Sequence, residues 1–158
     1  RHVTRRLPPG AVITYRHFGA ADRVKHARAL LRIARQKRLL LLIGADAPLA
    51  ARIGADGVHL PERDCRKAGR LRRQHPRWLV TSAAHSSRAL RTAAHLAILS
   101  PLLPSRSPSA GKPLGLRTGS AMARRAGVPV IALGGIDAHT QLRAGFAGLA
   151  AIDAFSKA

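Results

Sequence analysis

The chain has 158 residues, a formal net charge of +21, 46% hydrophobic residues and only 3% aromatic residues. Its single cysteine, Cys65, excludes an internal disulfide, and its longest apolar run, residues 39–43, is too short for a membrane span of about 20 residues. We therefore expect one domain over residues 1–158, with an aliphatic core, in a reducing cytoplasm.

The basic residues are spread along several predicted helices and are not gathered in one tract. No aromatic residues are interleaved with them to stack nucleic-acid bases. The sequence thus favours a basic decoration of outer helices, without specific nucleic-acid recognition. Any nucleic-acid binding is predicted to be non-specific and to weaken steeply as salt rises.

The first half of the chain alternates buried apolar runs with amphipathic stretches. Residues 11–18, 39–43 and 57–60 read as strands, and apolar residues at helical spacing predict a helix over 24–34. A short helix is expected after Asp46, with Pro48 in its first turn and Gly54 at its end.

The second half continues the alternation. Helices are predicted over 62–74, from His85 onward, around 121–125 and from Asp137 onward. Strands are predicted over 78–83, 96–99, 128–133, where Gly134 and Gly135 end the run, and 148–152. This pattern indicates an α/β fold of the (βα)8 TIM-barrel type. It is incomplete, because about seven of the eight strands expected for that barrel are recognisable.

Ligands of such barrels meet the loops that follow the strands. Gly134 and Gly135 end an apolar strand, where backbone amides can approach a phosphate closely. Ser105 to Lys112 fall in a loop of Pro, Ser and Gly, long enough to close over an anion. His85 lies at a strand-to-helix turn, and its imidazole is a candidate acid/base.

Five segments, in order along the chain, resemble motifs of the thiamine phosphate synthase/TenI family. One is the run Ala55-Asp56-Gly57-Val58-His59-Leu60 with Glu62 and Asp64 after it. The others are residues 84–86, 100–107, 132–136 and 150–154.

The resemblance implies a transferase of thiamine biosynthesis in a (βα)8 barrel. The synthase joins a pyrimidine methyl pyrophosphate to a thiazole phosphate with Mg²⁺ and releases pyrophosphate. The alternative TenI branch aromatises the thiazole phosphate by proton transfer, for which His85 is the acid/base. A third alternative is a non-catalytic protein that binds phosphate ligands or polyanions.

The resemblance also assigns residues to roles. Asp64 and Asp46 are the candidate Mg²⁺ ligands. The candidate substrate-binding residues are Arg16, Ser105, Arg106, Ser107, Lys112, Gly134, Gly135, Ile152 and Asp153. The expected partners are small phosphate substrates and a second copy of the chain, with no membrane.

Several residues depart from the family pattern. Phe18 stands where the family has the lysine that binds pyrophosphate, and Ala45 stands at the first metal carboxylate, with Asp46 one position later. Asp153 replaces the serine of the final phosphate turn. Departure of pyrophosphate needs cations held ready to receive its charge. The sequence therefore predicts a weak synthase with little Mg²⁺-dependent product.

Overall fold

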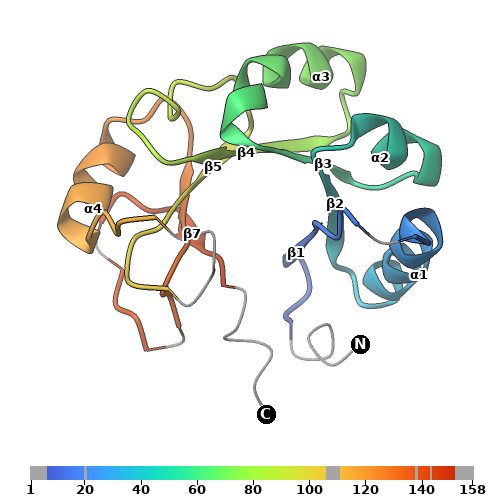
Figure 1. The fold of residues 1–158 in the computed structure, drawn as a ribbon, viewed down its shortest axis with the longest axis horizontal. Coiled ribbons are helices and arrows are strands. Elements are labelled where there is room, and N and C mark those ends of the chain that lie inside the picture. The colour runs from blue at the N-terminus through green and yellow to red at the C-terminus, as the bar shows by residue number, and fades with distance from the viewer. Residues whose placement is uncertain (1–6, 20, 106–110, 138, 143, 152–158) are drawn as a thin grey trace.

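The computed structural model describes residues 7–19, 21–105, 111–137, 139–142 and 144–151. Seven parallel strands follow one another across a single sheet in chain order, and helices cover its outer side (Figure 1). The strands are β1 (Val12–Tyr15), β2 (Leu40–Gly44), β3 (Gly57–Leu60), β4 (Leu79–Ala84), β5 (Leu96–Leu99), β6 (Val130–Ala132) and β7 (Gly148–Leu149). The helices are α1 (Arg23–Gln36), α2 (Ala47–Ile53), the 3-10 helix η2 (Glu62–Lys67), α3 (Ala68–Gln74) and α4 (Leu116–Arg124).

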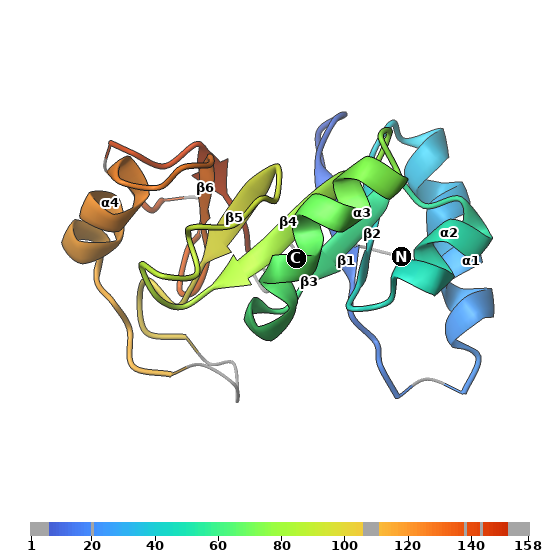
Figure 2. The same cartoon turned by 90° about the horizontal axis from the view of Figure 1, so that it is seen from above.

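The sheet curls into an open half-barrel (Figures 1 and 2). Each strand pairs in parallel with the next, and within the described residues β1 and β7 are the two edges. This confirms the predicted α/β fold with an incomplete barrel. Val12 and Leu149, on the edge strands, are 44% and 46% exposed. The expected homo-oligomer stays a prediction. None of the described helices is both long and apolar enough to cross a membrane.

The outer face of the sheet packs against the helices. Ala27, Leu31 and Ala34 of α1 form one buried cluster with Leu41 and Ile43 of β2. Side chains alternate along a strand, so the neighbours of these β2 residues face the concave side. Each fully buried Leu or Ile stabilises the fold by about 1.5–3 kcal/mol, so this cluster holds α1 firmly on the sheet.

The short helix α2 confirms the prediction made from its local signals. The Asp46 side chain accepts a hydrogen bond from the Leu49 N–H at 2.9 Å, which satisfies one free amide of the first turn. Pro48 lies in that turn, and Gly54 ends the helix in the left-handed conformation with φ +68°. These groups fix the end of β2 beside the start of α2.

The helix predicted after His85 is wrong, because the structure has only turns and bends over 85–95. The predicted cap does form, since Ser86 Oγ accepts from the Ala89 N–H at 3.2 Å. The chain continues in turns and bends instead, and Arg72 Nη1 donates to the Ala93 carbonyl, which ties this segment to α3. Burial of Ala89 and Leu90 holds the turn in place.

The helix predicted after Gly135 is also wrong for the described residues. Asp137 Oδ1 accepts from the His139 N–H at 3.0 Å and from Thr140 Oγ1 at 2.7 Å, so the local turn forms and then stops. The strand predicted from Val128 to the two glycines forms as β6, and the chain then leaves the sheet at the Gly134–Gly135 turn as predicted. The segments after His85 and after Gly135 are therefore turns where helices were predicted.

Candidate functional site

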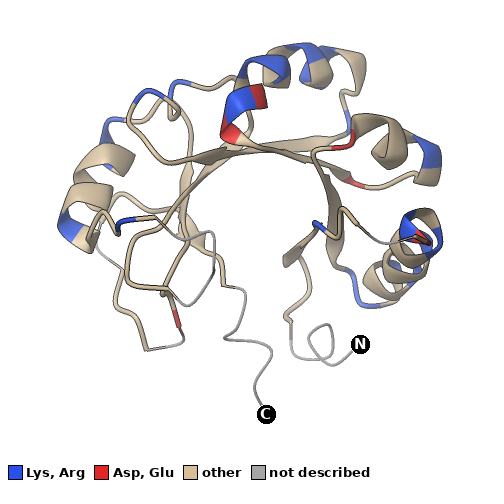
Figure 3. Cartoon of the chain, viewed as in Figure 1, with Lys and Arg blue, Asp and Glu red and all other residues tan. Residues whose placement is uncertain are grey.

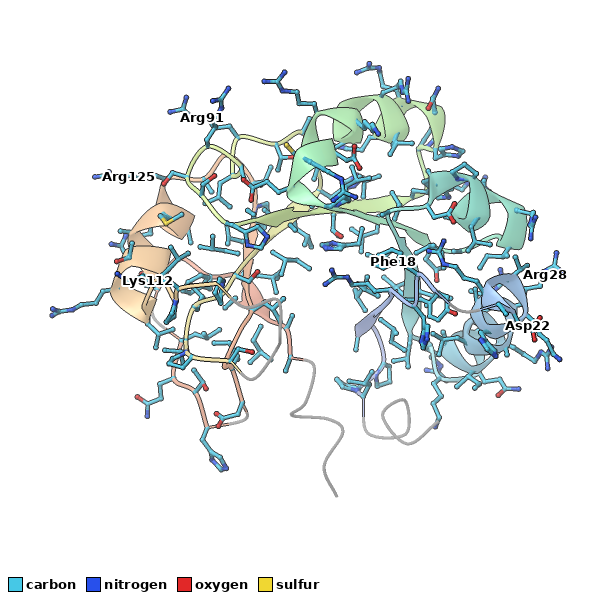
Figure 4. The ribbon with its side chains drawn as sticks, viewed as in Figure 1. Phe18, Asp22, Arg28, Arg91, Lys112 and Arg125 are labelled. Atoms are coloured by element: carbon cyan, nitrogen blue, oxygen red, sulfur yellow. The ribbon has the colours of Figure 1, made fainter. Side chains whose placement is uncertain are left out.

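The loops after the strands bring their polar residues to one edge of the half-barrel. Parallel strands all end at this edge, so the predicted site residues at Arg16, Asp46, His85 and the Gly134–Gly135 turn share it. Arg106, Ser107, Ile152 and Asp153 lie outside the described residues. Lys112 is exposed (Figure 4), and so is Ser105, which precedes residues 106–110 in the sequence.

A buried histidine lies at the concave side of this edge. His59 of β3 pairs in register with Gly44 of β2 and Thr81 of β4, and its Nδ1 lies 2.8 Å from Thr81 Oγ1. Burial, and then the positive charge of Arg16, lower the pKa of His59 to about 4. The imidazole is therefore neutral at physiological pH, and Arg16 is the nearby cation available to an anionic ligand.

His85 follows β4 and is held from two sides. The main-chain N–H of His85 donates to Glu62 Oε2 at 2.7 Å, and Ser86 Oγ donates to Glu62 Oε1 at 3.2 Å. Its Nδ1 lies 2.7 Å from the main-chain carbonyl oxygen of Ser100, at the end of β5. A carbonyl oxygen can only accept, so Nδ1 carries a proton and the neutral ring keeps its lone pair on Nε2. The ring is exposed, so its Nε2 can act as a base.

The Gly134–Gly135 turn follows β6, as predicted. Both residues have positive φ, +95° and +66°, a conformation that favours glycine. The Gly134 carbonyl accepts from the Leu103 N–H at 2.9 Å, which joins the turn to the loop after β5. Within the described residues, neither the Gly134 N–H nor the Gly135 N–H donates a hydrogen bond to a backbone carbonyl. Two such amides are suited to bind phosphate oxygens.

The candidate metal ligands Asp46 and Asp64 each carry a basic partner instead. Arg23 Nη1 makes a short ion pair with Asp46, and its Nη2 donates to the Gly44 carbonyl at 3.1 Å. Lys67 Nζ lies 2.7 Å from Asp64 Oδ1. Among the described residues, no three His, Cys, Asp or Glu side chains gather as a metal centre. As arranged, these carboxylates do not fit a Mg²⁺ ion.

Arg23 is the site residue that the sequence analysis missed. Its guanidinium lies over the Phe18 ring, 5.4 Å from the centroid, and reaches Asp46 from the first residue of α1. The sequence held one signal for this residue, its position in the first turn of α1. A cation there is unfavourable next to the positive end of the helix dipole, so a neighbouring acid is expected. The structure supplies that acid from α2, which the sequence does not place nearby.

Comparison with known proteins follows from this geometry. The model of a family described as thiamine monophosphate synthase, TMP-TENI, matches residues 2–155. A thiamine-phosphate synthase of Chlorobium luteolum is 34% identical over 167 residues, covering 99% of this chain and 79% of that protein. A second relative, from Aquifex aeolicus, is 33% identical over 116 residues, covering 71% of this chain and 62% of the relative.

A solved structure shares the fold. The thiamine phosphate pyrophosphorylase from Pyrococcus furiosus superposes with a TM-score of 0.74 at 20% identity, covering 90% of this chain and 72% of the other. The chain therefore spans between about three fifths and four fifths of the length of the relatives described here.

Proposed function

Because the chain belongs to the thiamine monophosphate synthase family, we propose that it forms thiamine phosphate from a pyrimidine methyl pyrophosphate and a thiazole phosphate, at a low rate. The observation that carries the proposal is the Gly134–Gly135 turn, with two left-handed glycines at the carboxyl end of β6. Its amides, free of backbone partners within the described part of the chain, would hold the phosphate of the thiazole substrate.

In the proposed reaction, the bond from the pyrimidine methylene carbon to a pyrophosphate oxygen breaks, and pyrophosphate leaves with the electron pair. The thiazole nitrogen gives its lone pair to that carbon. Arg16, at the end of β1, is the described cation beside the concave side that would stabilise the departing charge. The Mg²⁺ predicted for this step stays a prediction. Asp46 and Asp64 do not fit this ion as they are arranged, because they are held by Arg23 and Lys67, so Arg16 carries the proposed charge stabilisation.

The proposal is tested by measuring thiamine phosphate formation with the purified chain, with and without Mg²⁺. We expect slow turnover that falls further in Arg16→Gln, because the cation beside the site is lost. The matched control is Arg28→Gln, which removes an exposed arginine of α1 and leaves turnover unchanged (Figure 4). Absence of product at every enzyme concentration, or an unchanged rate in Arg16→Gln, would contradict the assignment.

A second candidate function rests on the orientation of His85. With Nδ1 directed to the Ser100 carbonyl, the exposed ring presents Nε2 as a base, which suits aromatisation of a thiazole phosphate by proton transfer. This reaction requires no metal. The tautomerase assay uses the same protein without Mg²⁺. Thiazole phosphate binding without turnover in either assay would favour the third alternative, a phosphate-ligand binding protein.

A further inference from the structure

We propose that the outer face of η2 and α3, with the turn after β4, binds the phosphate backbone of duplex nucleic acid without regard to sequence. This surface is defined by five arginines and is called the α3 surface. They are Arg66, Arg70, Arg73, Arg88 and Arg91. The inference is independent of the enzymatic function proposed above, because none of these residues lies in the candidate site.

Three of the arginines form a stripe that runs from η2 into α3. Arg66 lies near the end of η2, and Arg70 and Arg73 are spaced i and i+3 on one face of α3. All three are exposed, whereas Ala68 and Leu71 on the opposite side are buried against the sheet. Figure 3 shows the basic positions of η2 and α3 along the convex rim. The stripe therefore faces solvent.

The turn after β4 extends this stripe. Arg72 Nη1 donates to the Ala93 carbonyl at 3.0 Å, which fastens the turn beside α3. Arg88 and Arg91 are exposed in the same turn, and Arg91 projects outward in Figure 4. Five guanidinium groups thus come from two adjoining segments of the convex face.

The nearby acids do not neutralise this surface. Glu62 is occupied by the His85 N–H and by Ser86, and Asp64 pairs with Lys67. Within the described part of the chain, none of the five arginines forms an ion pair. Arg70 and Arg73 lie one turn apart in α3, and like charges at this spacing destabilise a helix by about 0.2–0.5 kcal/mol per pair, so an anionic partner would relieve this repulsion.

The α1 helix offers a natural comparison. Lys25, Arg28 and Arg32 share a helical spacing of i, i+3 and i+7, and all three are exposed. They line a shallow depression together with Asp22, whose carboxylate offsets part of their charge. The α1 stripe therefore has the same number of cations as the α3 stripe but a weaker local field.

The chemistry of the α3 surface favours duplex nucleic acid over other polyanions. Its five defining cations are arginines, whose planar guanidinium binds phosphate through paired hydrogen bonds, whereas the exposed Lys67 of η2 pairs with Asp64. No Phe, Tyr or Trp falls within residues 62–74 or 85–95, so unpaired bases would find none of these three rings to stack on. Among the described residues, the exposed large apolar side chains are Val12, Phe18, Leu40 and Leu149, and none of them lies on this surface, so it offers no large apolar side chain to insert into a membrane.

The test measures binding to labelled DNA and RNA duplexes of the same sequence by fluorescence anisotropy, from about 50 to about 200 mM salt. The triple variant Arg66→Gln/Arg70→Gln/Arg73→Gln is expected to lower the slope of log K against log salt by about three. The control Lys25→Gln/Arg28→Gln/Arg32→Gln removes the same charge and is expected to lower it by less than about one.

Two further measurements separate binding from folding and from bulk charge. The glutamine variant should melt at or above the wild-type temperature, because it removes like-charge repulsion. The variant with lysine at positions 66, 70 and 73 should keep the wild-type salt slope. The inference would be overturned if the α1 and α3 variants lowered the salt slope equally. A sequence preference at physiological salt would also overturn it, as would tighter binding to phosphatidylserine vesicles than to duplexes.

Discussion

Gly135 lies directly against Pro104. A Cβ atom at position 135 would come within 2.5 Å of the Pro104 carbonyl oxygen and 2.6 Å of the Leu103 Cβ. The glycine is therefore required by the packing of two loops as well as by its φ of +66°. A larger residue at position 135 would displace the loop after β5, so a loss of ligand binding in such a variant would not by itself show that the ligand contacts Gly135.

Replacing Gly135 by Ala is expected to destabilise the fold strongly. The matched control is Gly10→Ala, because Gly10 also has a positive φ, +84°, with nothing within 4 Å of a Cβ. The control should cost about 1–2 kcal/mol, the usual penalty of the left-handed conformation. Gly135→Ala should cost about 1–3 kcal/mol more through overpacking. Urea unfolding measures both, and equal losses would show that the loop after β5 yields freely.

The His85→Asn variant tests the proposed acid/base. Asparagine can keep a donor near the Ser100 carbonyl but has no group that exchanges protons near neutral pH. If the protein is a tautomerase, turnover should fall by about 10²–10⁴-fold while thiazole phosphate still binds. Turnover close to that of the wild type would assign His85 to positioning of the loop alone.

The Arg23→Gln variant tests the ion pair with Asp46. The side chains are only 18% and 28% exposed, so the pair is partly screened, and its loss should lower the free energy of unfolding by about 1–2 kcal/mol. Arg32→Gln, which changes an exposed arginine of the same helix, should alter the free energy of unfolding by less than about 0.5 kcal/mol.

Millimolar Mg²⁺ is expected to leave the melting temperature of the wild type unchanged, because Asp46 is held by Arg23. A clear shift there would show that Asp46 leaves Arg23 for the metal.

Stability should fall in acid through His59. Its pKa is lowered from 6.5 to about 4 in the folded chain, so the unfolded chain binds more protons between these values. The full contribution, about 3 kcal/mol, is present above pH 6.5 and is lost as pH falls toward 4. His59→Gln should flatten this part of the profile in urea unfolding from pH 4 to 8. His95, whose pKa is also lowered by burial, remains in both proteins. Parallel profiles would contradict the role of His59.

The elements that the sequence predicted well are those specified by local chemistry. Asp46, Pro48 and Gly54 define α2 within one short stretch, and the apolar run before Gly44 forms β2. Periodicity alone could not show that the segments after His85 and Gly135 stop at one turn. Their contacts with other segments, such as that of Arg72 with the Ala93 carbonyl and that of the Leu103 N–H with the Gly134 carbonyl, form only in the folded chain.

The candidate site was predictable only in part. The strand ends position His85 and Gly134–Gly135 where the alternation of elements places them. The pairing of Asp46 with Arg23 could not be predicted, because the two residues lie 23 positions apart and meet only when α1 packs on the sheet. The field of Arg16 at buried His59 likewise depends on the neighbouring strands.

The sequential order of the strands has a consequence for how the chain opens. Every strand pairs with its neighbour in sequence, and within the described part of the sheet nothing ties β7 back to β1. Each strand and its helix are therefore stabilised mainly by contacts with the units before and after them in the sequence, as in a linear repeat protein. Amide hydrogens of β3 and β4, which have partners on both sides, should exchange slowest with solvent. Those of the two outer strands should exchange fastest, because the half-barrel can fray from either end without unfolding its middle.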